Sequence, residues 1–191
     1  DSIVNLVMRR SAGCWPTIVM SVPCSVVTTG RRAGATSCLA RNADAANGIA
    51  VTNFDVGGHG GIVRGNIVRN IGQRVLSTLT DGSGNGFGIS VEADTIASDN
   101  TIENCAYAGL RIGFGPYLRN VTASGNIIRT SPFGIVASVV RGAGRATITG
   151  NTISGAARGA IVGVEWHKVM SGDLTQGGVE KFPALRVSGN K

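Results

Sequence analysis

Apolar and polar residues alternate with a period of two in many short runs of this chain. Strict alternation over four to eight residues is typical of β-strands that have one buried face. One kind of run has an apolar residue two positions after an asparagine; it starts at Asn66, Asn100, Asn126 and Asn151, with a truncated copy at Asn190. Spacing is tightest from Asn100 to Asn151 and wider on either side. A repeat of about 25 residues, rich in glycine and β-branched residues, indicates a solenoid rather than an ordinary globular fold.

A second kind of run starts at a glycine and alternates with the first along the chain. These glycines are Gly48, Gly88, Gly109, Gly134 and Gly159. The last three follow the preceding asparagine at a short and nearly constant distance, whereas Gly88 follows Asn66 at a much longer one. The longer distance contains an insertion at residues 73–85. We therefore predict an all-β fold over residues 47–191, a parallel β-helix of about five coils in which each coil adds strands to continuous sheets.

The alternation also predicts which side chains fill the interior. Three inward rows are expected, and their members are Val68, Ile102, Ile128 and Ile153; Val63, Ala97, Ala123 and Ile148; and Ile49, Ile89, Leu110 and Ile135. The repeated asparagines are expected to be structural. An asparagine tolerates left-handed geometry at a tight turn, and its amide can bond the asparagine of the next coil to form a ladder.

Composition and charge narrow the possible partners. Glycine supplies 29 of 191 residues and aromatic residues are scarce, which suits tight turns between short strands. The net charge of +7 comes mostly from arginine. The arginines are not interleaved with aromatic residues as in nucleic-acid modules, so we expect no nucleic-acid partner and a modest bias toward anionic ones. No metal-ligand spacing links the cysteines, Cys105 is expected to be buried, and no stretch of about 18 apolar residues predicts a transmembrane helix.

Residues 1–46 show neither kind of run and are left unassigned. They contain Arg9 and Arg10 ahead of an apolar stretch at residues 12–27, which is similar to a twin-arginine signal peptide although proline and cysteine interrupt it.

From residue 47 onward, about three quarters of the chain resembles a bacterial family of twin-arginine-translocated repetitive proteins with parallel β-helix repeats. The matching runs are 47–54 (NGIAVTNF), 91–95 (VEADT), 115–122 (GPYLRNVT), 158–163 (RGAIVG) and 171–174 (SGDL). The resemblance implies a right-handed parallel β-helix and a periplasmic or secreted bacterial protein. It implies no known reaction, because the family is uncharacterised.

Aligning the coils on the glycine-led strand groups three charged residues on one outward face. Two residues after the glycine lie Ala50, Ser90, Arg111, Val136 and Ile161. Glu92 and Asp94 follow Ser90 at alternating positions, so they would lie beside Arg111 as candidate catalytic residues. A carboxylate pair next to an arginine can bind a sugar or supply an acid and a base for a glycoside hydrolase-like or polysaccharide lyase activity. Outward charges are more often simply solvated.

Further polar residues would surround this group. His59, Tyr117 and Arg119 lie on loops after glycine-led strands and are candidate substrate-binding residues at the edge of a groove. Residues 166–168 (WHK) follow the last glycine-led strand. Their aromatic ring could stack on a sugar, but their position favours a cap over the last coil. Residues 81–86 with Glu92 have the spacing of a calcium loop, but no helices flank them, so no cofactor is expected and calcium is a minor alternative.

These observations predict an exported protein that binds or processes polysaccharide or cell-envelope glycan on an outer sheet face. The alternative is a structural or adhesive scaffold without chemistry, whose charges only keep it soluble.

Overall fold

The computed structural model describes residues 47–52, 60–72 and 86–191, together with the backbone of four earlier strands. These strands are β1 (Val19–Met20), β2 (Cys24–Val27), β3 (Ala33–Thr36) and β4 (Leu39–Ala43). His59, the insertion at residues 73–85 and all but the last residue of the calcium-like loop at 81–86 lie outside the described residues.

Nearly all regular structure in the described residues is β-strand. The later strands are β5 (Ile49–Thr52), β6 (Gly61–Arg64), β7 (Ile67–Ile71), β8 (Phe87–Val91), β9 (Thr95–Ser98), β10 (Thr101–Cys105), β11 (Ala108–Ile112), β12 (Val121–Ser124), β13 (Ile127–Arg129), β14 (Phe133–Ser138), β15 (Ala146–Thr149), β16 (Thr152–Ser154), β17 (Ile161–Glu165), β18 (Lys168–Val169) and β19 (Leu185–Ser188). Two short 3₁₀-helices, η1 (Gly115–Tyr117) and η2 (Val179–Lys181), complete the described elements. None of the described helices is long and apolar enough to cross a membrane.

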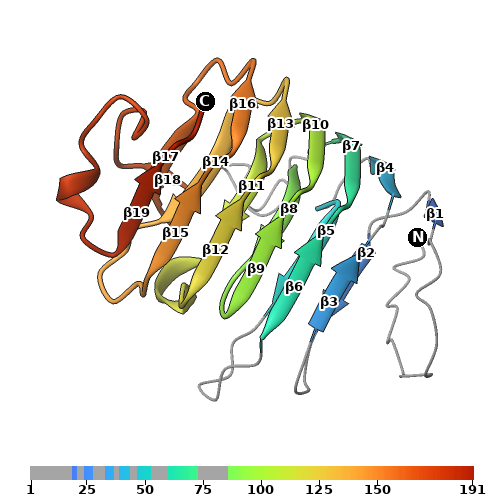
Figure 1. Cartoon of the computed structure of the whole chain (residues 1–191), viewed down its shortest axis with the longest axis horizontal. Helices are drawn as coiled ribbons and strands as arrows, with labels where there is room; N and C mark the ends of the chain where they lie inside the picture. The colour runs from blue at the N-terminus through green and yellow to red at the C-terminus, as the bar shows by residue number, and fades with distance from the viewer. Residues whose placement is uncertain are drawn as a thin grey trace, which may run out of the picture.

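The strands form three sheets, and the chain visits them in turn. Sheet 1 has the order β19-β15-β12-β9-β6-β3, sheet 2 the order β1-β4-β7-β10-β13-β16, and sheet 3 the order β18-β17-β14-β11-β8-β5-β2. Figure 1 shows β6, β9, β12, β15 and β19 of sheet 1 side by side. Apart from the antiparallel β17–β18 hairpin, the strand pairs are parallel, as between β12 and β15. The prediction of an all-β fold with parallel sheets is therefore confirmed.

Strand register confirms the three inward rows. Ile102 lies opposite Val68 and Ile128, and Ala123 lies opposite Ala97 and Ile148. Most members of these rows are completely buried. Cys105 lies in the same core, and its burial raises the pKa of the thiol to about 12. The thiol therefore stays protonated at neutral pH, as expected of a buried small apolar residue.

The glycines that start the strands of sheet 3 are required by close packing. A β-carbon on Gly109 would clash with Cγ2 of Ile128 and would lie 3.0 Å from the carbonyl oxygen of Gly134. Gly88 is confined in the same way by Ile102 and by the Gly109 carbonyl. The chain therefore turns into sheet 3 against the interior side chains of sheet 2, and only glycine fits this place.

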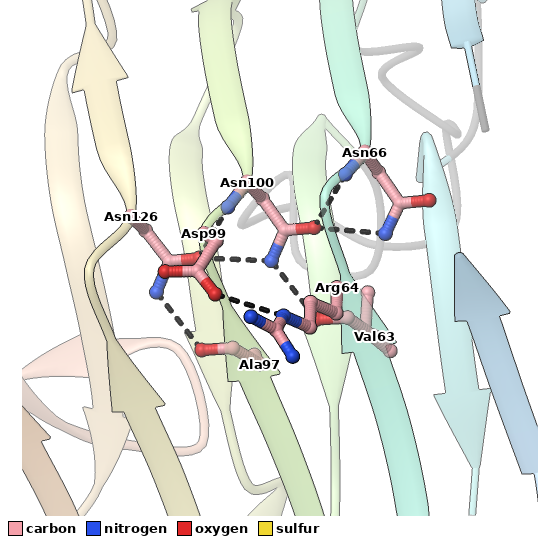
Figure 2. Close-up of polar contacts among 7 residues, drawn as sticks. All are labelled: Val63, Arg64, Asn66, Ala97, Asp99, Asn100 and Asn126. Carbon is pink, nitrogen blue, oxygen red and sulfur yellow. Dashed lines mark hydrogen bonds and ion pairs between the residues drawn. The ribbon is translucent and has the colours of Figure 1, made fainter. Parts of the chain in front are cut away.

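The asparagine ladder is present, and Figure 2 shows its first three members. Nδ2 of Asn66 donates to Oδ1 of Asn100 at 2.8 Å, and Nδ2 of Asn100 donates to Oδ1 of Asn126 at 2.8 Å. The series continues at 2.8 Å through Asn151 to Asn190. Amides of the ladder also bond backbone carbonyls, such as that of Ala97 for Asn126. The first four asparagines are at most 1% exposed, so the ladder lies inside the corner between sheets 1 and 2.

One detail of the asparagine prediction is wrong. The left-handed residue of each turn is not the asparagine but the residue before it, which leaves the asparagine outside the left-handed region with its amide directed inward. The left-handed residues are Gly65, Asp99, Gly125, Gly150 and Gly189, with φ of 67°, 56°, 63°, 63° and 61°.

The last glycine-led strand is also shifted by one residue from its predicted register. Val136 lies opposite Val162, and Ile161 lies opposite the buried Ile135. Ile161 is therefore an interior residue, whereas the outward row continues with Val162. The cause is an additional residue at the turn, where Gly159 has a φ of 140° and Ala160, rather than Gly159, occupies the place of the earlier glycines.

Candidate functional site

The outer face of sheet 3 carries a second apolar cluster, separate from the interior. Its buried members are Phe87, Ala108, Phe133, Val136, Val162 and Val164. Tyr107 and Val169 pack against them, with the Tyr107 ring 5.1 Å from that of Phe87 and 5.5 Å from that of Phe133. This face was expected to be exposed, and it is instead largely covered.

Arg111 lies within this covered face on β11. Its guanidinium carbon is 4.6 Å from the centre of the Phe87 ring and 5.1 Å from that of Phe114, and its Nε donates to Oγ of Ser90 at 2.8 Å. Cations are attracted to aromatic faces at such distances. The side chain is thus held by two rings and a hydroxyl.

Glu92 supplies the compensating charge for Arg111. It follows β8 and is 4% exposed. Burial lowers the pKa of Arg111, and the attraction of the Glu92 carboxylate partly opposes that shift. The structure therefore brings together two of the three predicted catalytic residues as a pair of opposite charge, in which Glu92 is buried and Arg111, against the Phe87 and Phe114 rings, is partly buried.

Asp94, the third predicted catalytic residue, belongs to a different cluster. Its Oδ2 accepts from Nε of Arg119 at 2.7 Å, and its Oδ1 accepts from Nδ2 of Asn120 at 3.2 Å. Asp94 has a φ of 46° at the turn into β9, which directs its side chain toward the next turn rather than along the outer face of sheet 3. It therefore pairs with Arg119, which had been assigned to substrate binding.

Exposed aromatic rings lie beside the Arg111 cluster. Trp166, at the turn of the β17–β18 hairpin, lies with its ring directly over Gly115 and 5.2 Å from the Phe114 ring. Trp166 remains 48% exposed, and Tyr117, two residues beyond Gly115, is 43% exposed. We call Trp166, Tyr117 and the intervening Gly115–Pro116 the aromatic platform. Trp166 was expected at the end of the stack, but it contacts the loop after β11, two strands away in sheet 3.

The segment after the hairpin covers the edge of β17. The Leu174 amide donates to the Ile161 carbonyl at 2.8 Å, and the Gly163 amide donates to Oγ of Ser171 at 2.8 Å. Asp173 accepts from the Ala160 amide at 2.7 Å and from the Thr175 amide and hydroxyl at 3.0 and 2.8 Å. Burial opposes ionisation of Asp173, but these hydrogen bonds outweigh it and lower its pKa.

Several residues of this site were not found from the sequence. Phe87 and Phe133 each directly precede a strand-leading glycine, at Gly88 and Gly134, and this repeated pair was a usable signal. The roles of Phe114 and Tyr107 had no such signal. The Tyr107 hydroxyl donates at 3.3 Å to the carbonyl of His167, far along the chain.

No comparison with known proteins identifies this chain. No family model, no curated protein and no solved structure matches it. Among the residues that the structure describes, no group of three or more histidine, cysteine, aspartate or glutamate side chains is placed to hold a metal ion.

Proposed function

We propose that this protein is an exported right-handed parallel β-helix that binds polysaccharide or cell-envelope glycan on exposed aromatic side chains beside the covered outer face of sheet 3. The helical winding is supported by strands that enter sheets 1, 2 and 3 in a fixed order, five times in succession from β3 to β17. Right-handed winding is the form that parallel crossover connections almost always take. Export is supported by the resemblance to twin-arginine-translocated proteins and by Arg9–Arg10.

The aromatic platform is the observation that carries the binding proposal. Trp166 and Tyr117 expose large rings, and Trp166 is held in place by Gly115 and Phe114. A fixed aromatic face packs against the C–H face of a sugar at little cost in conformational entropy. Arg111 contacts the rings of Phe114 and Phe87, and the Phe114 ring in turn packs against Trp166.

Binding fits these residues better than cleavage. Glycoside cleavage needs an acid within hydrogen-bonding distance of the glycosidic oxygen. Both oxygens of Asp94 already accept hydrogen bonds from Arg119 and Asn120, and Glu92 is buried at 4% exposure. In this proposal Glu92, Asp94 and Arg111 support the surface, and Tyr117 and Trp166 contact the glycan. His59 lies outside the described residues and stays a prediction from the sequence.

The test is polysaccharide affinity electrophoresis with the double variant Trp166→Ala and Tyr117→Ala. Loss of two stacking contacts should weaken binding by about tenfold or more. Met170→Ala, which removes another side chain of 44% exposure, is the matched control and should bind normally. Thermal unfolding of each variant establishes that it is folded.

The same assay separates the alternatives. Wild-type protein that binds none of a panel of neutral and acidic polysaccharides would overturn the proposal and favour the structural or adhesive scaffold. Release of shortened sugar by wild type, abolished in Glu92→Gln, would overturn our preference for binding and restore a catalytic role for Glu92.

A further inference from the structure

The excess positive charge of this protein is confined to one end of the chain. Residues 111–191 hold ten lysine and arginine residues and three acidic residues, whereas residues 1–110 hold eight of each. The net charge of +7 therefore belongs entirely to the C-terminal part that begins at Arg111. This part includes the aromatic platform.

Three of the basic residues belong to the two segments that meet at the corner where sheet 3 leads into sheet 1. Arg141 and Arg145 lie in the loop between β14 and β15, and Lys181 ends η2; all three are exposed. A pocket of about 190 Å³ opens between the two segments, with Lys181 and the apolar side chains of Val140, Ala143, Phe182 and Pro183 in its wall. We call Arg141, Arg145 and Lys181 the basic corner. Within the part of the chain that the structure describes, none of the three forms an ion pair.

The basic corner is continuous with the aromatic platform. The Gly144 amide donates at 2.7 Å to the carbonyl of Leu118, which directly follows Tyr117 in the chain. A β-carbon on Gly144 would lie 2.7 Å from that carbonyl oxygen and 3.1 Å from Cα of Arg119, so the loop is packed closely against this segment. Ser138, which also lines the pocket, donates from Oγ to the Gly115 carbonyl at 2.7 Å, beneath the Trp166 ring.

We infer that the basic corner makes this surface selective for acidic polysaccharide, with Arg141, Arg145 and Lys181 binding the carboxylates of a uronic-acid chain whose sugar rings lie on the aromatic platform. This inference rests on the proposed glycan-binding function. Guanidinium groups match carboxylates with paired hydrogen bonds, and the lysine ammonium adds a compact charge. The apolar pocket wall accepts the unsubstituted face of a sugar ring beside them.

The experiment compares two probes with one backbone, polygalacturonate and its fully methyl-esterified form, which lacks the charge. Binding of each is measured with wild type and with Arg141→Gln/Arg145→Gln. The matched control is Arg129→Gln/Lys191→Gln, which removes the same charge from exposed residues on sheet 2 and at the last residue of the chain. We expect wild type to prefer polygalacturonate, and the Arg141/Arg145 variant to lose about tenfold in affinity for it while its binding to the ester is unchanged. Lys181→Gln should lose affinity in the same direction, by less.

Three results would overturn this inference and are distinguishable from one another. In the first, wild type binds the two probes equally and the Trp166→Ala/Tyr117→Ala variant binds both more weakly. This result would remove the preference for acidic polysaccharide and leave the proposed function standing. An equal loss of affinity for polygalacturonate in the Arg141/Arg145 variant and in the control variant would mean that the protein attracts any polyanion. Single-stranded DNA that binds as tightly as polygalacturonate, and that both variants weaken alike, would mean the same. Binding of neither probe, nor of any other glycan, by wild type would remove the proposed function as well.

Discussion

The strands of sheet 3 and sheet 1 have the same alternating pattern, but the outer face of sheet 3 is buried and the outer face of sheet 1 is exposed. In β14 of sheet 3, all six residues of Phe133–Ser138 are buried. In β12 of sheet 1, Val121–Ser124 alternates between buried and partly exposed residues. Alternation along a strand therefore determines the inward side chains, and the burial of the outward ones depends on what packs over the sheet afterwards.

The cover on sheet 3 comes from segments outside the repeated strands. The β17–β18 hairpin places Trp166 over the loop after β11, and Tyr107 packs between Phe87 and Phe133. The outward residues of sheet 1 include β-branched and hydroxyl side chains, such as Ile96 at 47% exposure, Thr122 and Thr147, together with the exposed Arg64. Open β-sheet faces need no further packing, whereas the buried charges of sheet 3 require it.

The largest expected difference between the two faces follows from truncating one outward side chain on each. Phe133→Ala should lower the free energy of unfolding by about 3–5 kcal/mol, because it opens a cavity in the second apolar cluster. Ile96→Ala on the open face should cost less than about 1 kcal/mol. Urea unfolding followed by circular dichroism measures both. Similar costs for the two would contradict the view that sheet 3 has a second core.

The next largest difference compares two charge pairs. Arg111→Met should cost about 3 kcal/mol, because it removes the cation beside the buried Glu92 carboxylate. Adding Glu92→Gln should recover much of that loss. On the open side, Arg64 pairs with Asp99 at 2.9 Å with 64% and 53% of the two side chains exposed, so Arg64→Met should cost under about 1 kcal/mol.

A double-mutant cycle for each pair provides the measurement. The coupling between Arg111 and Glu92 should exceed that between Arg64 and Asp99 severalfold. A coupling near zero for the first pair would show that the two charges are screened by water, and that the cover over sheet 3 is open in solution.

The interior and the ladder were predictable because their signals are local. Ile102 and Ala123 follow from alternation within one strand, and the ladder follows from asparagines that recur at one place in each repeat. Strands β1–β4 carry no such signal, although Leu39 of β4 lies opposite Ile67 of β7 in the register of the later strands. The residue before β4 is Cys38, where the later strands have asparagine.

The site was only partly predictable, because its environment depends on distant contacts. The grouping of Glu92 with Arg111 follows from register, since Ser90 lies opposite Arg111. Their burial does not, because it depends on Tyr107 and on a hairpin far along the chain, whose His167 accepts the Tyr107 hydroxyl. Asp94 was grouped with them by continuing the strict alternation of β8 as far as residue 94. Asp94 itself has a left-handed φ of 46°, which ends that alternation.

The asparagine ladder gives a third prediction, at the corner that repeats most regularly. Asn126→Ala should lower the free energy of unfolding by about 2–3 kcal/mol, because the backbone and side-chain amides of Asn100 both donate to Asn126 and would lose a buried acceptor. Asn104→Gly is the control: Asn104 is exposed and left-handed with a φ of 54°, a geometry that glycine adopts without strain. Equal destabilisation by the two changes would show that the ladder amides exchange with water.

The smallest expected effect tests how the covered face is closed at its edge. Asp173→Asn should cost about 1–2 kcal/mol at neutral pH, because the carboxylate accepts hydrogen bonds from Ala160 and Thr175. The folded state lowers the pKa of Asp173, so this contribution is complete above the ordinary aspartate pKa of about 3.9 and declines as the pH falls through the lower folded value. The stability difference between wild type and variant should therefore shrink on acidification, which urea titrations from pH 7 into the acid range can follow.

Asp99→Asn, on the open side, should cost under about 1 kcal/mol at neutral pH. A difference at Asp173 that stays constant with pH would mean that the charge of the carboxylate contributes nothing to the edge, and that the cover over sheet 3 is held by its apolar contacts alone.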